Sequence, residues 1–130
     1  MWKEELPINC PPEIAKEMET LAYRILKEEE PQEPDFLTYV DLYPGNNRYK
    51  TLCEAFALSS FDSIQNAIAA WKRALKRGKV IGGYIGEIQI EPSDGKNDVN
   101  QKTGHISTWL YETRVNNQFE CTDINPINGN

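Results

Sequence analysis

The chain's only histidine opens a segment, residues 104–112 (GHISTWLYE), whose pattern is typical of a β-strand. Side chains alternate across a strand, so one face would carry four polar or aromatic residues: His105, Ser107, Trp109 and Tyr111. Histidine titrates near neutral pH and can act as a general base, while the aromatic rings offer flat surfaces for stacking. We therefore predict a binding surface along this row. The alternative is an ordinary half-exposed sheet surface.

The sequence around this row supports neither a nucleophilic triad nor a metal site. It contains no Gly-x-Ser-x-Gly motif, and its three cysteines (Cys10, Cys53 and Cys121) include no Cys-x-x-Cys pair. Widely spaced cysteines in odd number fit a reducing cytosol better than a disulfide framework or a zinc site. The sequence thus predicts a cytoplasmic protein with no metal and no disulfide.

A second set of residues occurs in an order that suggests a different chemistry. Arg24 lies on a possible early strand, and Ser59 closes another strand just before a helix. Gln118 and Glu120 form a Gln-x-Glu motif at the start of the last strand, after the loop 114–117.

This order resembles the arginine–serine–glutamate class of ADP-ribosyltransferases, which use NAD. The resemblance implies that Arg24 would hold the NAD phosphates and that Ser59 would orient the glutamate or the nicotinamide pocket. Glu120 would hold the nicotinamide ribose and stabilise an oxocarbenium-like transition state, and Gln118 would position the acceptor. Ser59-Ser60 stands where that class has a Ser-Thr-Ser triplet.

The chain as a whole also resembles a family of bacterial proteins to which no activity is attached. The shared features are Pro11-Pro12, Asp35-Phe36, the segment Ala-Leu-Ser-Ser-Phe at 57–61, and a Gly-His sequence followed by Ser/Thr and Trp at 104–109. They extend over most of the chain. The resemblance implies neither a substrate nor a cofactor.

Length and charge limit the possible classes of protein. A chain of 130 residues supports one domain, here residues 1–130, with a tail at 125–130 that we expect to fray. No apolar run approaches the roughly 20 residues of a membrane span, and no leader is visible. Residues 1–36 hold ten acidic and four basic side chains, which equals the entire net charge of −6. This distribution disfavours nucleic-acid binding and favours a basic protein partner.

The N-terminal third allows two secondary-structure assignments. Apolar residues at helical spacing after Pro11-Pro12 predict a helix over about 12–28. A short helix followed by a strand at 21–27 is the alternative, because that segment also alternates. Residues 35–43 could form a short helix or an edge strand, and residues 52–58 alternate as a strand would.

The remaining elements are clearer. An apolar stripe, an N-terminal Asp62 and a C-terminal Gly78 predict an amphipathic helix at about 62–77. Residues 80–90 (VIGGYIGEIQI) predict a central strand whose glycines admit a neighbouring helix or a ligand. We therefore predict an α+β domain with a mostly antiparallel sheet of about four to six strands and one or two N-terminal helical pieces.

Taken together, these features predict a small binding module for a protein or a small ligand, without a bound cofactor. The alternative is a transferase that takes ADP-ribose from NAD, with Arg24, Ser59, Gln118 and Glu120 at its site.

Overall fold

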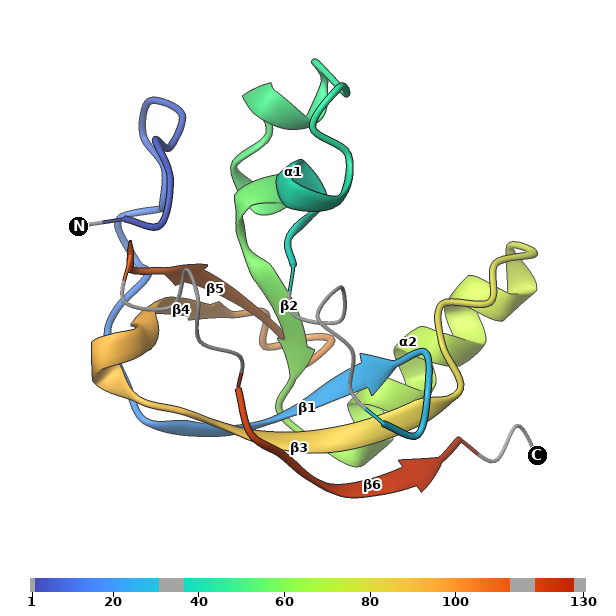
Figure 1. Cartoon of the computed structure of the whole chain (residues 1–130). Coiled ribbons are helices and arrows are strands. Elements are labelled where there is room, and N and C mark those ends of the chain that lie inside the picture. The colour runs from blue at the N-terminus through green and yellow to red at the C-terminus, as the bar shows by residue number, and fades with distance from the viewer. Residues whose placement is uncertain (1, 31–36, 113–118, 128–130) are drawn as a thin grey trace.

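Six strands form a single antiparallel sheet in the computed structural model, which describes residues 2–30, 37–112 and 119–127. The strands are β1 (Thr20–Leu26), β2 (Leu58–Phe61), β3 (Tyr84–Ile90), β4 (Gly95–Val99), β5 (His105–Leu110) and β6 (Cys121–Pro126). Their order across the sheet is β4-β5-β2-β1-β3-β6 (Figure 1). The predicted α+β class and antiparallel sheet are confirmed.

The helical elements lie at two separate places on the sheet. Helix α1 (Tyr39–Leu42) and the 3-10 helices η2 (Tyr49–Thr51) and η3 (Cys53–Phe56) form one lobe, and α2 (Ile64–Lys76) lies apart from it (Figure 1). A third 3-10 helix, η4 (Pro92–Asp94), links β3 to β4. None of the helices that the structure describes is long and apolar enough to cross a membrane.

Helix α2 confirms the predicted amphipathic helix, with a different cap. The Ser63 hydroxyl accepts a hydrogen bond from the Asn66 backbone N–H at 3.0 Å, so Ser63 is the N-cap residue. Asp62 instead accepts a hydrogen bond from the Asn66 side-chain amide at 2.7 Å. At the other end Gly78 has φ +77°, the left-handed conformation expected just after a helix.

The prediction of a helix over about 12–28 is wrong, and the alternative strand is present. Strand β1 pairs with β3 along its whole length, from Thr20 opposite Ile90 to Leu26 opposite Tyr84. On its other side Tyr23 pairs with Phe61 of β2. A segment with strand neighbours on both sides has its backbone hydrogen bonds satisfied by the sheet, and this outweighs its helical periodicity.

The strand predicted at 52–58 is wrong over most of its length. Residues Cys53–Phe56 form η3, and the strand β2 begins only at Leu58. The carbonyl of Cys53 accepts a hydrogen bond from the Trp109 indole at 3.0 Å, and Ala55 donates to the Leu52 carbonyl. These hydrogen bonds occupy backbone groups that, in a strand, would pair with the neighbouring strand.

The cysteines also differ from expectation, because Cys10 and Cys53 form a disulfide across 43 residues of chain. It ties the N-terminal segment to η3. Cys121 takes no part in this disulfide, and its side chain packs against the core of the sheet. The pairing depends on two segments that meet only in the folded chain, so cysteine spacing did not reveal it.

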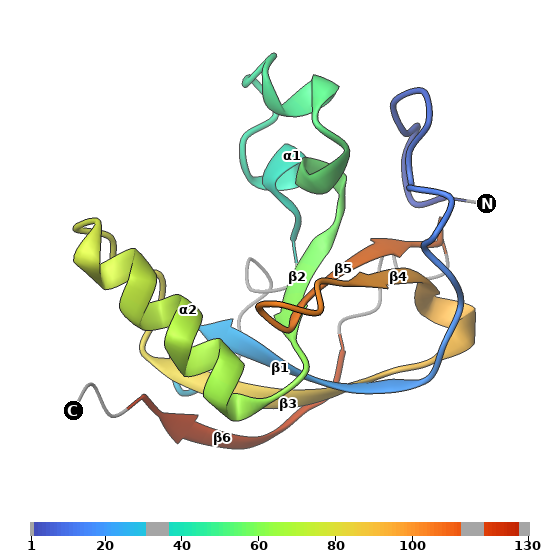
Figure 2. The ribbon, with the colours of Figure 1, turned by 180° about the vertical axis from the view of Figure 1, so that it is seen from behind.

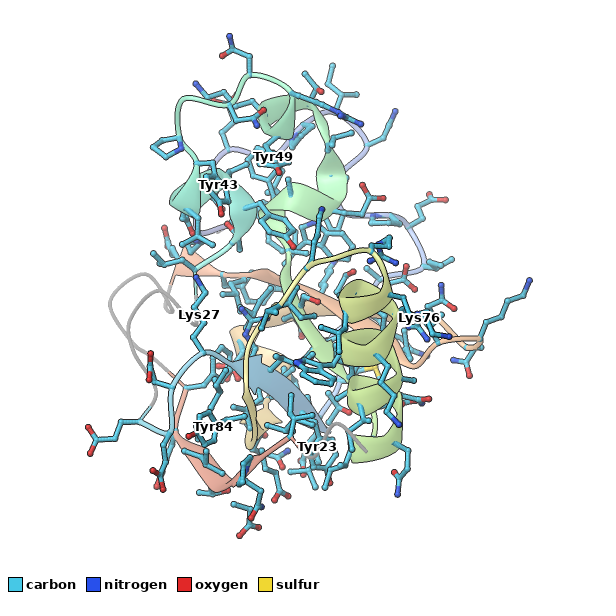
Figure 3. The ribbon with its side chains drawn as sticks, turned by 90° about the vertical axis from the view of Figure 1, so that its right-hand side faces the viewer. Tyr23, Lys27, Tyr43, Tyr49, Lys76 and Tyr84 are labelled. Atoms are coloured by element: carbon cyan, nitrogen blue, oxygen red, sulfur yellow. A yellow bond between two sulfur atoms is a disulfide. The ribbon has the colours of Figure 1, made fainter. Side chains whose placement is uncertain are left out.

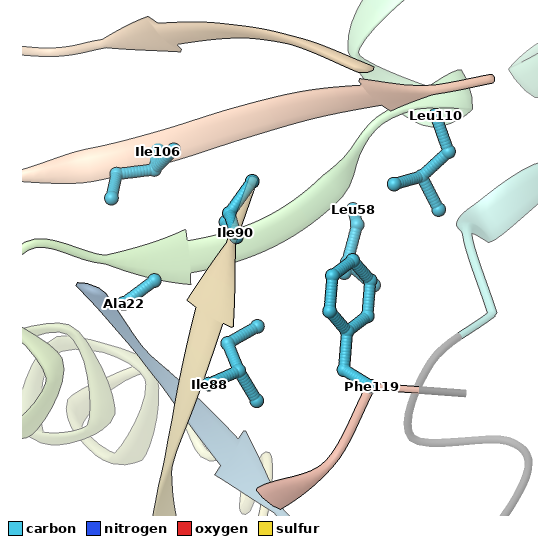
Figure 4. Close-up of a cluster of buried hydrophobic side chains, with 7 residues drawn as sticks. All are labelled: Ala22, Leu58, Ile88, Ile90, Ile106, Leu110 and Phe119. Atoms are coloured by element: carbon cyan, nitrogen blue, oxygen red, sulfur yellow. The ribbon is translucent and has the colours of Figure 1, made fainter. Parts of the chain in front are cut away.

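One face of the sheet curls around the main hydrophobic core. Side chains from strands that are far apart in the order converge there (Figure 4): Ala22, Leu58, Ile88, Ile90, Ile106, Leu110 and Phe119. Full burial of a Leu or Ile side chain contributes about 1.5–3 kcal/mol, so this cluster is a major source of stability. Ile106 and Leu110 of β5 face this core.

The opposite face is covered by two separate lobes (Figure 2). The N-terminal segment and η3 pack over Trp109, in a cluster with Ala15, Phe56 and Ala57. Helix α2 packs through Ala67 against Phe61 and Ile85. His105 and Ser59 lie on this face too, because side chains alternate along β5 and β2.

Two of the three glycines in the predicted central strand, Gly82 and Gly86, face neighbouring strands rather than a helix or a ligand. Strand β3 is an interior strand, between β1 and β6. A Cβ on Gly86 would lie 2.1 Å from the Cys121 sulfur, and one on Gly82 would lie 2.6 Å from the Leu26 carbonyl oxygen. Neighbouring strands therefore occupy the space beside Gly82 and Gly86.

The C-terminal tail was expected to fray from residue 125. Strand β6 extends to Pro126, and the Ile127 N–H donates to the Gly83 carbonyl at 2.8 Å. Residues 125–127 are therefore held against β3, and residues 128–130 lie outside the described part of the chain.

Candidate functional site

The row predicted on β5 exists, but its four side chains have different surroundings. Trp109 is only 2% exposed and its indole N–H donates to the Cys53 carbonyl, so the ring is covered by the N-terminal segment and η3. Tyr111 donates to a Glu17 carboxylate oxygen at 2.6 Å, and its ring centroid lies 4.9 Å from that of Trp2. Burial and the Glu17 carboxylate raise the pKa of Tyr111 to about 12. His105 and Ser107 thus remain as the members of the row that line an open site.

A hollow of about 260 Å³ lies over these two residues. Strands β2 and β5 and the segment from α1 to η3 supply its lining: Tyr39, Tyr49, Leu52, Glu54, Ala55, Ala57, Ser59, His105 and Ser107. Polar groups from adjacent strands thus meet an apolar and aromatic wall from the helical lobe. This combination is characteristic of small-molecule sites.

Ser59 and His105 are in direct contact in this hollow. The Ser59 hydroxyl oxygen lies 2.6 Å from His105 Nε2, a hydrogen bond between neighbouring strands. The register explains it: Ser59 is opposite Ser107 and Phe61 is opposite His105, so Ser59 and His105 are diagonal neighbours on one face. The Phe61 ring meets the imidazole edge-on, with centroids 5.4 Å apart.

Arg24 stands next to this pair. It lies on β1, the next strand in the sheet, and its guanidinium donates to the Ser59 carbonyl oxygen. Burial of the imidazole and then the positive charge of Arg24 hold the pKa of His105 below its usual value of 6.5. His105 is therefore mainly neutral at pH 7, and in the tautomer that carries its proton on Nδ1 the Nε2 atom accepts the hydrogen bond of the Ser59 hydroxyl.

Three tyrosines gather on the helical lobe above the hollow. The ring centroids of Tyr39 and Tyr49 are 5.5 Å apart with an interplanar angle of 22°, and the Tyr43 ring lies 5.8 Å from Tyr49. Figure 3 shows Tyr43 and Tyr49 at the outer end of this lobe. Tyr39 and Tyr49 also line the hollow, so this cluster adds a flat aromatic surface to it.

Glu120 does not line the hollow over Ser59 and His105. It lines a different hollow, of about 500 Å³, with Leu21, Glu87 and Gln89. Its neighbour Phe119 packs into the main core and also lines this second hollow. The structure thus brings Arg24 and Ser59 together and separates Glu120 from the hollow that Ser59 lines. Gln118 lies outside the described residues.

Within residues 2–30, 37–112 and 119–127, no group of three or more His, Cys, Asp or Glu side chains is placed to hold a metal ion.

Sequence reasoning missed both the pairing of Ser59 with His105 and the contribution of Tyr39 and Tyr49. Ser59 was considered only with Arg24 and Glu120, and His105 only with its own strand. The alternating pattern at 104–112 places His105 on the correct face of β5, and alternation along Leu58–Phe61 places Ser59 on the correct face of β2. The missing information was that β2 and β5 are neighbours, although 46 residues separate Ser59 from His105.

Comparison of the chain with protein-family models, with curated proteins and with solved structures finds no match. The geometry of the hollow is therefore the basis for a functional proposal.

Proposed function

We propose that this protein is a binding module for a small ligand, which occupies the hollow over Ser59, His105 and Ser107. The observation that carries the proposal is the convergence of three polar side chains at the base of a hollow whose upper wall is aromatic and apolar. A few placed polar groups in an otherwise apolar concavity fix the orientation of a ligand, and the apolar wall supplies affinity.

The size of the hollow limits the ligand. At about 260 Å³ it lies just below the roughly 300–1,000 Å³ usual for drug-sized molecules. A ligand with a single flat ring or a short aliphatic chain fits this volume. Tyr39 and Tyr49 favour the flat ring, because aromatic faces stack well against one another.

The charges around the hollow indicate which end of the ligand is polar. Arg24 lies close enough to lower the pKa of His105, which places positive potential at the base. Hydroxyl groups of Ser59 and Ser107 can donate hydrogen bonds there. A carbonyl or carboxylate oxygen suits this end. Glu54 lies in the lining and disfavours a second negative group.

A ligand screen tests the proposal. Small aromatic carbonyl compounds and carboxylates are added to the protein, and thermal unfolding and the NMR signals of His105 are followed. A ligand at 100 times its dissociation constant should add about 2.7 kcal/mol of stability. Tyr49→Ala should weaken binding, while Tyr84→Ala, on β3 and outside the lining, should not. Binding that shifts no His105 signal would contradict this site.

NAD and related nucleotides form a second arm of the same screen. The transferase hypothesis requires Arg24, Ser59 and Glu120 to converge, and Glu120 lines another hollow. That separation supports the small-ligand proposal over the transferase. NAD binding that is lost in both Arg24→Gln and Glu120→Gln would reverse this preference.

A second candidate function is capture of a basic protein. Glu28, Glu29 and Glu30 follow the end of β1 and their side chains are exposed, which is the geometry needed for electrostatic steering. Neutralising all three should slow association with a basic partner and reduce its salt dependence. Capture of partners from cells that is unaffected by these changes and by salt would exclude this function.

A further inference from the structure

We propose that Ser59 is a nucleophile, activated by His105, that accepts an acyl group from a small ester bound in the hollow. The proposal rests on the same hollow as the proposed function, but it adds a covalent step that reversible binding does not require.

The first support is geometric. An activated serine needs a base within about 2.6–3.2 Å of its oxygen, and Ser59 Oγ lies 2.6 Å from His105 Nε2. Both residues lie on paired strands, with Ser59 opposite Ser107 and Phe61 opposite His105. Two neighbouring strands in fixed register hold the pair more rigidly than loops would.

The second support is electrostatic. Burial and Arg24 keep the His105 imidazole neutral at pH 7, so it can take the serine proton. The Arg24 guanidinium is anchored on the backbone carbonyl of Ser59, beside the nucleophile but outside the lining of the hollow. A fixed positive charge beside Ser59 favours the negative charge that develops as the serine attacks.

The third support is access. Ser59 and His105 both line the hollow, so a ligand can reach the hydroxyl. The neighbouring Ser60 differs in this respect: its side chain is 1% exposed and faces away, and its hydroxyl has no hydrogen-bond partner in the described part of the chain. Of these adjacent serines, only Ser59 is reactive. Ser93, an exposed serine of η4 outside the lining of the hollow, provides the control.

The reaction is an acyl transfer in two halves. Ser59 Oγ forms a bond to the carbonyl carbon while its proton passes to His105 Nε2. The bond from that carbon to the alkoxy or aryloxy group then breaks, and His105 returns the proton to the leaving oxygen. The product is an ester of Ser59. Water, activated in the same way by His105, attacks this ester, releases a carboxylic acid and restores the Ser59 hydroxyl.

Labelling with p-nitrophenyl acetate tests the proposal. The full chain is treated with the ester, p-nitrophenol release is followed, and the acetylated residue is located by peptide mass spectrometry. We expect one acetyl group on Ser59. Ser59→Ala should abolish it, Ser93→Ala should leave its rate unchanged because that exposed serine of η4 lies outside the lining, and His105→Gln should slow it by about 10²–10⁴-fold. Acetylation of lysines alone, or equal acetylation of wild type and Ser59→Ala, would overturn the proposal.

The pH dependence of the wild type gives an independent readout if His105→Gln fails to fold. The acetylation rate should rise with pH through one inflection below 6.5, where His105 loses its proton. A rate that rises only in the alkaline range, as for lysine, would overturn the proposal. Ser59→Ala that still binds the small carbonyl ligands but is not acetylated would support both proposals. Binding with no acetylation in the wild type would leave only the reversible binding site.

Discussion

At the scale of single residues, the surroundings of His105 decide what it can do. It contacts Ser59 through Nε2 and the Phe61 ring edge-on, and Arg24 lies near enough to disfavour its charged form. A solvent-exposed histidine would be partly protonated at neutral pH, and the protonated fraction could not accept a proton from Ser59. The pairing with Ser59 therefore depends on burial and on Arg24.

The titration of His105 can be measured directly, because the chain has a single histidine. We expect its NMR midpoint below 6.5, and we expect Arg24→Gln to raise it by removing a nearby positive charge. Lys72→Gln, which removes a charge from the exposed face of α2, is the control and should leave the midpoint unchanged.

Stability should follow the same titration. The unfolded chain takes up the His105 proton near pH 6.5 and the folded chain only at lower pH. The contribution of neutral His105 is thus fully present above 6.5 and is lost as the pH falls through the folded pKa. Removing the group by His105→Gln should flatten the stability profile in that window, as read by urea unfolding.

At the scale of elements, the pairing of β3 with β6 depends on a glycine. The register between these strands shifts between Ile85 and Glu87, and Asp123 on β6 has φ +47°, which identifies a bulge. The Cys121 side chain occupies the place where Gly86 would have a Cβ. Strand β6 can approach β3 at this point only because Gly86 has no side chain.

Gly86→Ala should therefore destabilise the protein by about 1–3 kcal/mol, the usual cost of forcing extra volume into a packed site. Gly83→Ala is the control, since a Cβ there meets nothing within 4 Å. Adding Cys121→Ala should recover part of the loss in a double-mutant cycle measured by chemical denaturation. Equal losses for Gly83→Ala and Gly86→Ala would contradict the close approach of β6.

At the scale of the whole molecule, the sheet carries two lobes on one face, and the proposed site lies beside the one that includes η3. The Cys10–Cys53 disulfide joins the N-terminal segment to this lobe, directly next to Leu52 and Glu54 of the hollow. A cross-link at this position stabilises the fold and also the wall of the site.

Removal of the disulfide by Cys10→Ser with Cys53→Ser should lower stability by roughly 2–4 kcal/mol, because the unfolded chain loses a long closed loop. Denaturant unfolding of the oxidised wild type and the double variant measures this difference. Reductant should destabilise the wild type and leave the double variant unchanged, and Cys121→Ser should retain the sensitivity to reductant. Intact-mass analysis showing two free thiols at Cys10 and Cys53 in the oxidised protein would contradict the pairing.

The sequence alone determined the features that depend on local periodicity. Alternation in 104–112 predicted the two faces of β5, the apolar stripe predicted α2, and the apolar run at 80–90 predicted an interior strand. Each of these patterns involves residues that are close together in the sequence. The corresponding element can therefore be predicted without knowing the fold.

Only the tertiary structure decided which segments meet. Residues 20–26 satisfy both a helical and a strand pattern, and pairing with β2 and β3 selected the strand. Three further features depend on positions that are distant in the chain. They are the Ser59–His105 contact, the Cys10–Cys53 disulfide and the location of Glu120 in a different hollow from Ser59. Strand order and register set these distances, and both result from the burial of the whole sheet rather than from any one segment.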